Sequence, residues 1–307
     1  MIEGIKIYSA PLQGYTDHIW RNAHAKHFGG VDVYCAPFAR VEHGEIKSRD
    51  IRDIAQENNK VECMRPQILA CAPDDALMLA NKIKESGYTI IDINLGCPHP
   101  PIALKHKGSG MLKYPIEVAQ MLEKLATIEG IEYTVKMRLG WDDCNQWKEV
   151  LDCFDIIKPK HVAVHPRIGK QQYKGELLMD GFTEFYHSCH CPIIYNGEIL
   201  SAEHIMQIKS LFPCIEGVMV GRGLVATPFM LSTEQRGNLM KFHAELLGQY
   251  SIHLSGGDMQ ILNKMKSLWT MFLPQANHKL RKAISKSRNL DQYVHASTEA
   301  IKSVIDT

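Results

Sequence analysis

The sequence predicts a (β/α)8 barrel of the TIM type, an α/β fold, followed by a smaller all-helical C-terminal domain. Three observations carry this prediction. Eight short β-rich runs recur through the first three-quarters of the 307 residues, helical patterns separate several of them, and strand signals stop after about residue 235. We therefore place the barrel in residues 1–235 and the helical domain in residues 236–307.

The predicted strands are short and mostly apolar throughout. Segments such as IIDI (90–93) and VAV (162–164) suit parallel strands that are buried on both faces. Eight strands alternating with helices over about 235 residues match a barrel in number and in length. The strands are expected at residues 6–11, 31–36, 67–71, 89–94, 133–138, 161–165, 192–196 and 217–220.

Parallel strands need crossover helices, and the sequence supplies helix ends between the strands. Pro73 opens an amphipathic run that stops at Gly87, Pro115 opens another that stops at Gly130, and Ser201 opens a third. An open doubly wound sheet is the alternative architecture. The turn after the first strand, PLQG (11–14), lacks the GxGxxG pattern that usually marks that fold.

Composition and charge exclude several protein classes. Hydrophobic residues make up 45% of the chain and charged residues 22%, which are ordinary values for a globular protein. The net charge of +1 argues against a protein that coats nucleic acid or membranes through its overall charge. No signal-peptide pattern and no apolar run of the ~18 residues needed for a membrane span occurs, so we expect a cytoplasmic protein without membrane association.

The cysteines indicate free thiols rather than a disulfide framework. There are nine of them, an odd number, and none forms a CxxC pair. The cluster HSCHC (187–191) contains metal-ligand residue types, but it lacks the usual zinc spacing because no distant partner pair accompanies it. We therefore expect no metal site.

Polar residues and glycines stand where the predicted strands end, and those ends carry the active site in a barrel. Lys136 lies within an apolar strand, where an unpaired charge is costly, so an anionic or electron-rich partner is expected for it. The segments NG (196–197) and GRG (221–223) follow the last two strands, where barrels commonly bind phosphate. These glycines also suit tight turns, but together with Arg222 and Lys136 they favour a phosphate-bearing ligand.

Six motif regions follow one another along the predicted barrel: APLQGYTD (10–17), DINLGCP (92–98) with GSGML (108–112), VKMRLGW (135–141), HPR (165–167) through QYKG (172–175), NGEI (196–199) and GRGL (221–224). In this order they resemble the motifs of the tRNA-dihydrouridine synthases, an FMN-dependent family. In the tail, KMKSLW (264–269) is loosely similar to a basic, aromatic helix motif of that family. One departure follows Cys97-Pro98: the family usually has a small residue, Lys and Val there, and this chain has HPPI (99–102), whose prolines should stiffen the loop.

The resemblance implies an enzyme that reduces specific uridines of tRNA to 5,6-dihydrouridine, with FMN as cofactor and NADPH as electron donor. Hydride from the flavin would go to C6 of the uracil, and Cys97 would protonate C5. By motif position, FMN would be held by Pro11, Leu12, Gln13, Gln67, Lys136, His165, Asn196, Gly197, Glu198, Gly221 and Arg222. The uridine and its phosphates would be contacted by Asn94, Arg138, Arg167, Gln172 and Tyr173, with Arg40 as a further tRNA contact on the barrel.

A cysteine suits the role that the resemblance gives to Cys97. If hydride arrives on one face of the base, the protein must offer an acid on the other face. A thiol with a pKa near ~8.5 is mostly protonated at neutral pH and can serve as that acid. The alternative for any single cysteine is a small buried side chain, but Cys97 stands between a glycine and a proline just after a strand.

Positive charge is concentrated in the tail. Residues 241–307 hold nine basic and five acidic residues, a net charge of +4, which leaves −3 for the rest of the chain. Between Lys264 and Arg288 there are seven basic residues and no acidic one. Such a stretch is typical of a surface that binds a phosphate backbone, although many basic runs are simply solvated helix faces. We predict tRNA contacts by Lys264, Lys266 and Arg281.

Three other functions stay open on the sequence alone. One is a sugar-phosphate barrel without flavin, which flavin absorption by the purified protein would exclude. An FMN barrel that acts on a free pyrimidine or on dihydroorotate would share the flavin site but would need no basic helical tail. A non-catalytic tRNA-binding protein could retain the scaffold, although it would have no use for Cys97 and Lys136. The expected partner is tRNA, no protein partner is predicted, and the chain is expected to be a monomer.

Overall fold

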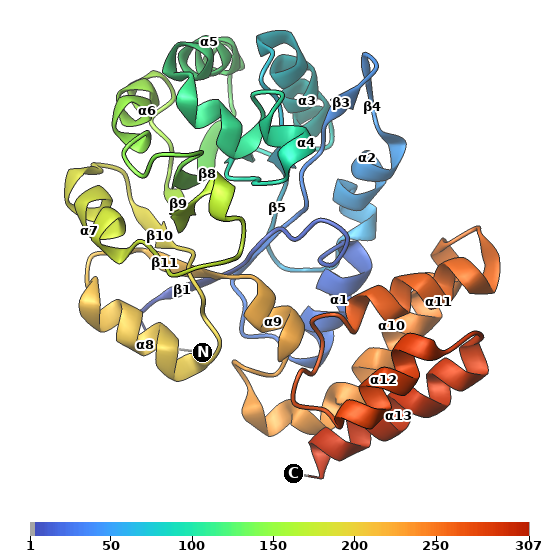
Figure 1. Ribbon diagram of the computed structural model, residues 1–307. Coiled ribbons are helices and arrows are strands. Elements are labelled where there is room, and N and C mark those ends of the chain that lie inside the picture. The colour runs from blue at the N-terminus through green and yellow to red at the C-terminus, as the bar shows by residue number, and fades with distance from the viewer. Residues whose placement is uncertain (1–3, 307) are drawn as a thin grey trace.

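The computed structural model describes residues 4–306, and its first two-thirds form a closed barrel of parallel strands surrounded by helices (Figure 1). Residues 1–3, where the predicted barrel begins, and residue 307, where the predicted helical domain ends, lie outside the described residues. The barrel strands are β1 (Lys6–Ser9), β2 (Val33–Cys35), β5 (Met64–Arg65), β6 (Gln67–Ile68), β7 (Ile90–Leu95), β8 (Glu132–Gly140), β9 (Val162–Ile168), β10 (Ile193–Tyr195) and β11 (Gly217–Val220). A separate hairpin consists of β3 (Val41–Glu42) and β4 (Glu45–Ile46).

The barrel closes through a strand that a proline divides. The sheet runs in the order β5-β2-β1-β11-β10-β9-β8-β7-β6, and its two end strands are separated in the chain only by Pro66. Met64 pairs with Tyr34 on one side, and Gln67 pairs with Asp92 on the other. Proline has no N–H to donate to a ladder, so it interrupts the strand where the two pairings meet. Together, β5 and β6 occupy the third of eight strand positions around the barrel. This arrangement confirms the predicted (β/α)8 barrel.

Helices cover the outside of the barrel in the order expected for crossover connections. The α-helices of this part are α1 (His18–His27), α2 (Ser48–Ile54), α3 (Pro73–Glu85), α4 (Pro100–Ala103), α5 (Pro115–Ala126), α6 (Trp147–Cys153), α7 (Met179–Ser188), α8 (Ala202–Leu211) and α9 (Arg222–Ala226). Short 3₁₀ turns are η1 (Gln56–Asn58), η2 (Gly108–Lys113), η3 (Phe154–Ile156), η4 (Gly169–Gln171) and η5 (Thr233–Asn238).

Local sequence signals account for the helix starts. Pro73 and Pro115 occupy the first turns of α3 and α5, where their missing N–H groups cost nothing. Ser201 caps α8 by accepting the backbone N–H of His204. The departure HPPI becomes the short helix α4, which begins at Pro100, so the two prolines open a helical turn directly after the Cys97 loop.

The chain after the barrel is helical, as predicted. It contains α10 (Leu239–His253), α11 (Gly257–Leu268), α12 (His278–Lys286) and α13 (Leu290–Ile305). Helix α10 packs against α1, where the rings of Phe28 and Phe242 meet edge to face with centroids 5.2 Å apart. One buried core continues from the barrel wall into these helices, and η5 spans the predicted boundary at residue 235. The division into domains at that residue stays a prediction.

Two apolar layers support the barrel. Small and medium side chains fill its interior, including Ala163, Ile194 and Met219, all at most 1% exposed. A larger layer lies between the strands and the surrounding helices. Within residues 4–306, no helix combines the length and the apolar character that crossing a membrane requires.

Candidate active site

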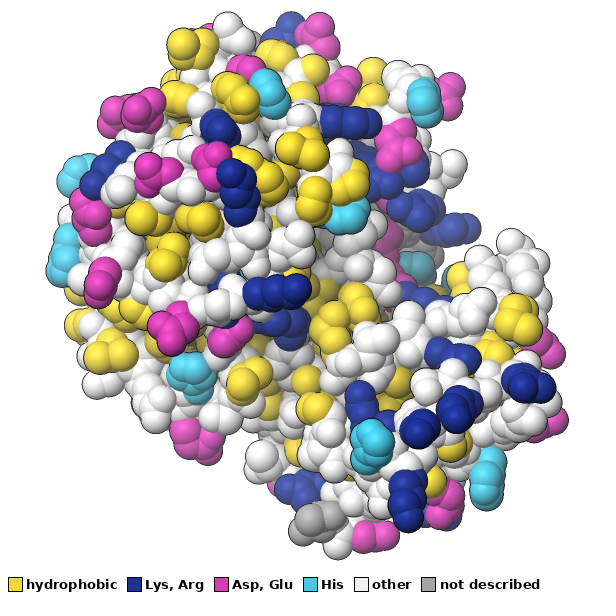
Figure 2. All heavy atoms as spheres, in the orientation of Figure 1, with side chains coloured by type: hydrophobic (Ala, Val, Ile, Leu, Met, Phe, Trp, Pro, Cys, Tyr) yellow, Lys and Arg dark blue, Asp and Glu magenta, His cyan; other side chains and the backbone are white. Residues whose placement is uncertain are grey.

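A cavity lies at the mouth of the barrel, where the strands end. Its empty volume is ≈ 750 Å³, counting space that is open to solvent. It brings together thirteen of the residues predicted from sequence: Pro11, Leu12, Gln13, Asn94, Cys97, Lys136, Arg138, His165, Tyr173, Asn196, Gly197, Gly221 and Arg222. Lys and Arg side chains are visible near the middle of the barrel face in Figure 2.

Four further residues line this cavity that the sequence analysis did not single out as site residues: Ala10, Phe38, Gly96 and Pro98. Three of them flank predicted residues within the motifs, so the motif spacing could have indicated them. Phe38 comes from the loop after β2, and an isolated phenylalanine in that loop gives no signal that separates a site residue from a core residue.

Lys136 lines the cavity from the middle of β8. It pairs in register with Asn94 on β7 and with Ala163 on β9. Burial, assisted by the positive charge of Arg138, lowers the pKa of the Lys136 ammonium to about 8. Among the described residues, no hydrogen bond or ion pair engages that ammonium. An unpaired cation in this position is suited to an anionic or electron-rich group placed in the cavity.

The loop that carries Cys97 is fixed by hydrogen bonds on both sides. Asn94 Oδ1 accepts the backbone N–H groups of Gly96 at 3.0 Å and of Cys97 at 2.8 Å. The carbonyl of Cys97 accepts the N–H of Ser109 at 3.1 Å and its hydroxyl at 2.9 Å. Burial raises the pKa of the Cys97 thiol, although neighbouring cationic side chains oppose the rise. The thiol therefore holds its proton at neutral pH, as a general acid must.

Gly108 explains why the second half of this motif begins with glycine. Its φ of +59° lies in the left-handed region that side chains rarely adopt. A Cβ atom built there would lie 2.8 Å from the Cβ of Cys97. The GSG turn therefore packs directly against the loop of Cys97. The two halves of this motif, residues 92–98 and 108–112, are thus in contact although nine residues separate them in the sequence.

Tyr173 lies between two cationic side chains at the cavity. The guanidinium carbon of Arg222 is 4.7 Å from the centre of its ring, and that of Arg138 is 5.4 Å away. Arg138 is itself held by the carbonyls of Gly96 and Ile168. Burial, together with the charges of Arg138 and its cationic neighbours, lowers the pKa of His165 well below its usual value, so its imidazole is neutral.

At the other end of the cavity, glycines and Arg222 follow the last two strands. A Cβ at Gly221 would come within 3.3 Å of the Ala10 Cβ, so a side chain there would crowd the first strand. Asn196 Nδ2 donates to the carbonyl of Met219 and fixes the end of β10 to β11. These loops leave backbone close to the cavity beside one guanidinium, an arrangement that fits a phosphate.

Glu198 and Arg167 do not line the cavity but support it from behind. Glu198 Oε1 accepts from Arg167 at 2.7 Å and from Arg222 at 3.1 Å. Partial burial opposes ionisation of Glu198, but the two guanidinium groups outweigh it and lower the pKa of this carboxyl. Glu198 thus orients Arg222, and Arg167 holds Glu198 in place. Any direct contact of Glu198 with FMN or of Arg167 with uridine stays a prediction.

Gln67 is buried beneath the cavity, and Gln172 is on the surface outside it. Gln67 is fully buried, donates to Asp92 and accepts from Asn94, so it contacts the site through Asn94. Gln172 has a φ of +52° and ends the turn η4 next to Tyr173. Their assignment to cofactor and substrate is not tested by these contacts.

The predicted tRNA residues of the tail make contacts within the protein. Lys264 Nζ pairs with Asp17 at 2.7 Å and also donates to the carbonyl of Gly14. Lys266 donates to the carbonyl of Ser287. The Arg281 guanidinium donates to three backbone carbonyls, those of Trp269, Phe272 and Leu273. Arg40, on the barrel, forms an ion pair with Glu42.

A different set of basic residues faces solvent. Lys279, Lys282 and Lys286 lie at spacings of three and four along α12, Arg288 follows that helix, and all four are exposed. Within residues 4–306, none of their side chains takes part in a hydrogen bond or an ion pair. Figure 2 shows Lys and Arg side chains along the helical region. We call these four residues the α12 stripe. Trp269 and Phe272, which stand among the basic residues of the tail in the sequence, are buried in the core.

A second cleft joins the cavity mouth to the helical region. Its walls include Gln13 and Phe38, which also line the first cavity, and Arg49, Arg52 and Lys264 from helices on opposite sides. Figure 2 shows basic side chains over α2, which forms one side of this cleft. The path from the barrel mouth to α11 is therefore continuous. Its walls also hold three aspartates, and two of these pair with basic residues of the cleft, Asp50 with Arg49 and Asp17 with Lys264.

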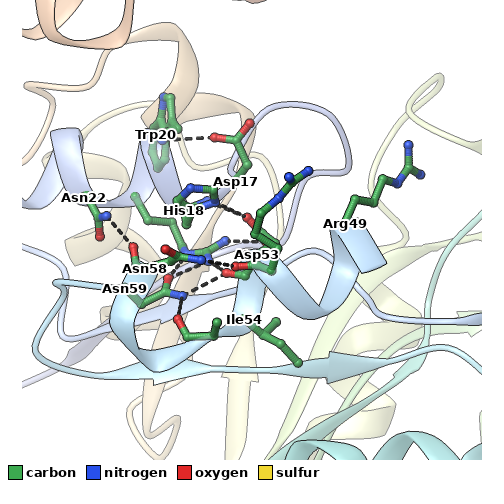
Figure 3. A network of polar contacts seen from close by, with 12 residues as sticks. Asp17, His18, Trp20, Asn22, Arg49, Asp53, Ile54, Asn58 and Asn59 are labelled. Atoms are coloured by element: carbon green, nitrogen blue, oxygen red, sulfur yellow. Dashed lines mark hydrogen bonds and ion pairs between the residues drawn. The ribbon is translucent and has the colours of Figure 1, made fainter. Parts of the chain in front are cut away.

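A polar network fixes α2 beside that cleft (Figure 3). Asp53 Oδ1 accepts the backbone N–H of His18 at 2.6 Å, and its Oδ2 accepts from Arg21 at 3.0 Å. Arg21 also donates to Asn59 at 2.6 Å. Burial opposes ionisation of Asp53, but Arg21 and His18 lower the pKa of its carboxyl, so the network carries a buried ion pair. It connects α1, α2 and the following turn.

The chain is similar to one family of known proteins. A family model described as "Dihydrouridine synthase (Dus)" matches residues 8–304. Over 234 residues the chain is 30% identical to tRNA-dihydrouridine synthase B of Pasteurella multocida, covering 73% of this chain and 67% of that protein. Over 238 residues it is 29% identical to the tRNA-dihydrouridine(16) synthase of Haemophilus ducreyi, covering 74% and 73%.

Solved structures with a similar barrel share little sequence with this chain. The old yellow enzyme from Trypanosoma cruzi superimposes with a TM-score of 0.54 at 10% identity, over 76% of this chain and 88% of that one. A variant of NCR from Zymomonas mobilis gives a TM-score of 0.51 at 11% identity, over 75% and 85%. At such identities the likeness concerns the fold alone.

Proposed function

The chain belongs to the dihydrouridine synthase family, and we propose that it reduces specific uridines of tRNA to 5,6-dihydrouridine with FMN as cofactor and NADPH as electron donor. The names of its relatives support tRNA as the substrate. The observation that carries the proposal is a single cavity that contains both a protonated thiol, Cys97, and an unpaired ammonium, Lys136.

The residues of the cavity fit FMN. The ammonium of Lys136 lacks a partner and suits the electron-rich ring system, and the glycine loops beside Arg222 suit the phosphate. One wall of the cavity is formed by the residues that follow the first strand, Pro11, Leu12 and Gln13. His165, Asn196, Gly197 and Gly221 would hold the remainder, with Gln67 and Glu198 supporting them from behind.

Saturating the C5=C6 bond of uracil takes a hydride at C6 and a proton at C5. FMN bound in the cavity and reduced by NADPH would supply the hydride. The Cys97 thiol gives its proton to C5, and the resulting thiolate regains a proton from solvent through the open mouth of the cavity. The raised pKa of Cys97 keeps the acid form populated before each turnover.

Two residues that line the cavity with Cys97 would receive the base, and a third holds the loop of Cys97. Arg138 is fixed by the carbonyl of Gly96 in the reactive loop, and Tyr173 lies against Arg138 and Arg222. Asn94 holds the same loop through its backbone. We assign Arg138 and Tyr173 to the uracil and its phosphate, and Asn94 to the orientation of the loop.

The body of the tRNA would follow the cleft from the barrel mouth to the helical region. On one side of this path lies α2, where Arg49 pairs with Asp50 and the Arg52 side chain has no partner within residues 4–306. The solvent-exposed α12 stripe lies on the helical region. Lysine and arginine side chains without partners in the protein are available for phosphate oxygens. The α12 stripe therefore replaces Lys266 and Arg281 as our main candidate for tRNA contact, whereas Lys264 lines the cleft itself.

The test compares substrates for the purified, flavin-loaded protein. Unmodified tRNA, free uridine and orotate are each incubated with NADPH, and products are analysed by mass spectrometry. We expect a gain of two hydrogens on uridines of tRNA and no reaction with the free compounds. Reduction of a free pyrimidine without reaction on tRNA would assign the protein to the alternative class of FMN barrels. No reaction with tRNA, uridine or orotate would favour the non-catalytic tRNA-binding protein.

A further inference from the structure

A relay of hydrogen bonds connects Asp92, inside the barrel, to the backbone of Cys97. Asp92 Oδ2 accepts from Gln67 Nε2 at 2.6 Å, and Gln67 Oε1 accepts from Asn94 Nδ2 at 2.7 Å. Asn94 Oδ1 then accepts the N–H of Cys97 at 2.8 Å. Asp92 is 1% exposed and Gln67 is fully buried, so water does not compete for these bonds.

The relay has one consistent direction. A side-chain amide presents a donor at one end and an acceptor at the other, and the two ends have nearly the same shape. The backbone N–H of Cys97 only donates, whereas an ionised carboxyl group only accepts. Two amides can join these groups without a donor facing a donor only when each amide points the same way along the relay, as Gln67 and Asn94 do.

The second oxygen of Asp92 is also engaged as an acceptor. Its Oδ1 accepts from the hydroxyl of Thr134 at 2.6 Å, and the Arg65 guanidinium reaches that hydroxyl oxygen at 3.5 Å. Burial raises the pKa of Asp92, and the hydrogen bonds from Thr134 and Gln67 oppose that rise. Both carboxyl oxygens therefore face donors, and neither contacts the cavity directly.

We propose that Asp92 is a positioning residue for Cys97, because it gives Gln67 the acceptor that orients both amides and so presents Asn94 Oδ1 to the reactive loop. This inference rests on the proposed function for the catalytic role of Cys97. It assigns to Asp92 a hydrogen-bonding role rather than an electrostatic one. An acceptor at residue 92 is what the relay requires, whether or not that acceptor is charged.

The variants follow from that requirement. Asp92→Asn can turn its carbonyl oxygen to Gln67 and its NH₂ group to the hydroxyl of Thr134, which can accept, so the relay survives. Asp92→Leu removes the acceptor, and Gln67→Met interrupts the relay one bond further along. Thr134→Val is the matched control, because it removes the other hydrogen bond of Asp92 and leaves the relay intact.

The primary readout is the alkylation rate of Cys97 by iodoacetamide, measured in the flavin-loaded protein by peptide mass spectrometry. Cys214 is exposed and reports reagent activity, and Cys35 is buried and reports unfolding. In Asp92→Leu and in Gln67→Met, we expect Cys97 to react about threefold to tenfold faster than in wild type. Loss of one buried hydrogen bond should let the loop open more often by about that factor. The double variant that combines Asp92→Leu with Gln67→Met should react no faster than either single variant, because both changes break the same relay.

Two comparisons decide the outcome. Wild-type rates at Cys97 in Asp92→Asn and Thr134→Val, with unreactive Cys35 in every variant, support the proposal. Equal Cys97 rates in wild type and both relay-breaking variants overturn it, and so does an Asp92→Asn rate as high as that of Asp92→Leu. Should Cys35 react in Asp92→Leu, the Gln67→Met comparison decides alone. Turnover on tRNA, measured in parallel, tests the proposed function separately, because the alkylation ranking does not depend on it.

Discussion

Asn94 holds Cys97 through the peptide backbone, with its Oδ1 2.8 Å from the N–H of the cysteine. The two residues close a turn at the end of β7, and the Ser109 hydroxyl donates to the carbonyl of the same cysteine. This turn, rather than the thiol alone, places an acid in the cavity that Lys136 also lines.

Replacing Cys97 by alanine should separate chemistry from cofactor binding. Cys97→Ala removes the proton donor without touching the phosphate loops, so flavin absorption should be retained while turnover falls by about 10²-fold to 10⁴-fold. Cys71→Ala is the control, since that thiol is half-buried and lies outside the cavity. Dihydrouridine formation at the wild-type rate by Cys97→Ala would remove this residue from the mechanism.

Lys136 predicts a pH dependence of stability for the flavin-free protein. Its pKa in the fold is about 8, below the ordinary value of 10.5, so folding disfavours the charged form. Below pH 8 the ammonium is charged in both states and the fold bears the full penalty. Between pH 8 and 10.5 the unfolded chain binds more protons, so stability rises with pH, and above that range the penalty is gone.

The measurement is the difference between wild type and Lys136→Met. Thermal unfolding of both proteins without flavin, from pH 7 to pH 10.5, should show the variant as the more stable one at pH 7, with the gap closing as pH rises. A gap that stays constant over this range would show that Lys136 does not titrate as its burial implies. Flavin affinity should fall in the variant, because the cavity loses its unpaired cation.

Arg281 should matter for stability more than for tRNA binding. It donates to three carbonyls at the end of α11 and in the following loop, so Arg281→Ala should lower the free energy of unfolding by about 2 kcal/mol. Lys282→Ala, the exposed neighbour, should leave that free energy unchanged. Chemical denaturation measures both, and equal stability of the two variants would contradict the structural role.

The α12 stripe should carry salt-dependent tRNA affinity. The triple variant Lys279→Ala, Lys282→Ala, Lys286→Ala should bind tRNA more weakly and reduce the slope of log affinity against log salt by about 2 to 3. The charge-matched control replaces Lys60, Lys84 and Lys158, three exposed lysines of the barrel region. If both triple variants bind alike across the salt range, the stripe is not the tRNA surface.

The fold and most of the cavity could be predicted because the signals are local. Buried parallel strands read as short apolar runs, and polar residues directly after them must meet at one end of a barrel. That reasoning predicts Lys136, Cys97 and Arg222 at the same end of the barrel, and all three line the cavity. It did not foresee that Pro66 divides the third strand, since the two pieces pair with different neighbours.

Charge counting was less informative in the tail. The sequence does not reveal whether a basic side chain binds a phosphate or a carbonyl of its own chain. In the structure, Lys266 and Arg281 donate to carbonyls. Trp269 and Phe272 stand among these basic residues in the sequence, but the helices bury both. The support of Cys97 by Asn94 and Asp92 also depends on contacts between strands, which spacing along the chain does not reveal.

The most direct test of the central claim is a map of dihydrouridine in cellular tRNA. Cells that lack this gene are complemented with the wild-type chain or with Cys97→Ala, and each tRNA position is measured by mass spectrometry. We predict that defined uridines lose the modification in the deletion, regain it with wild type and stay unmodified with Cys97→Ala. An unchanged map in the deletion, or full restoration by Cys97→Ala, would contradict the account.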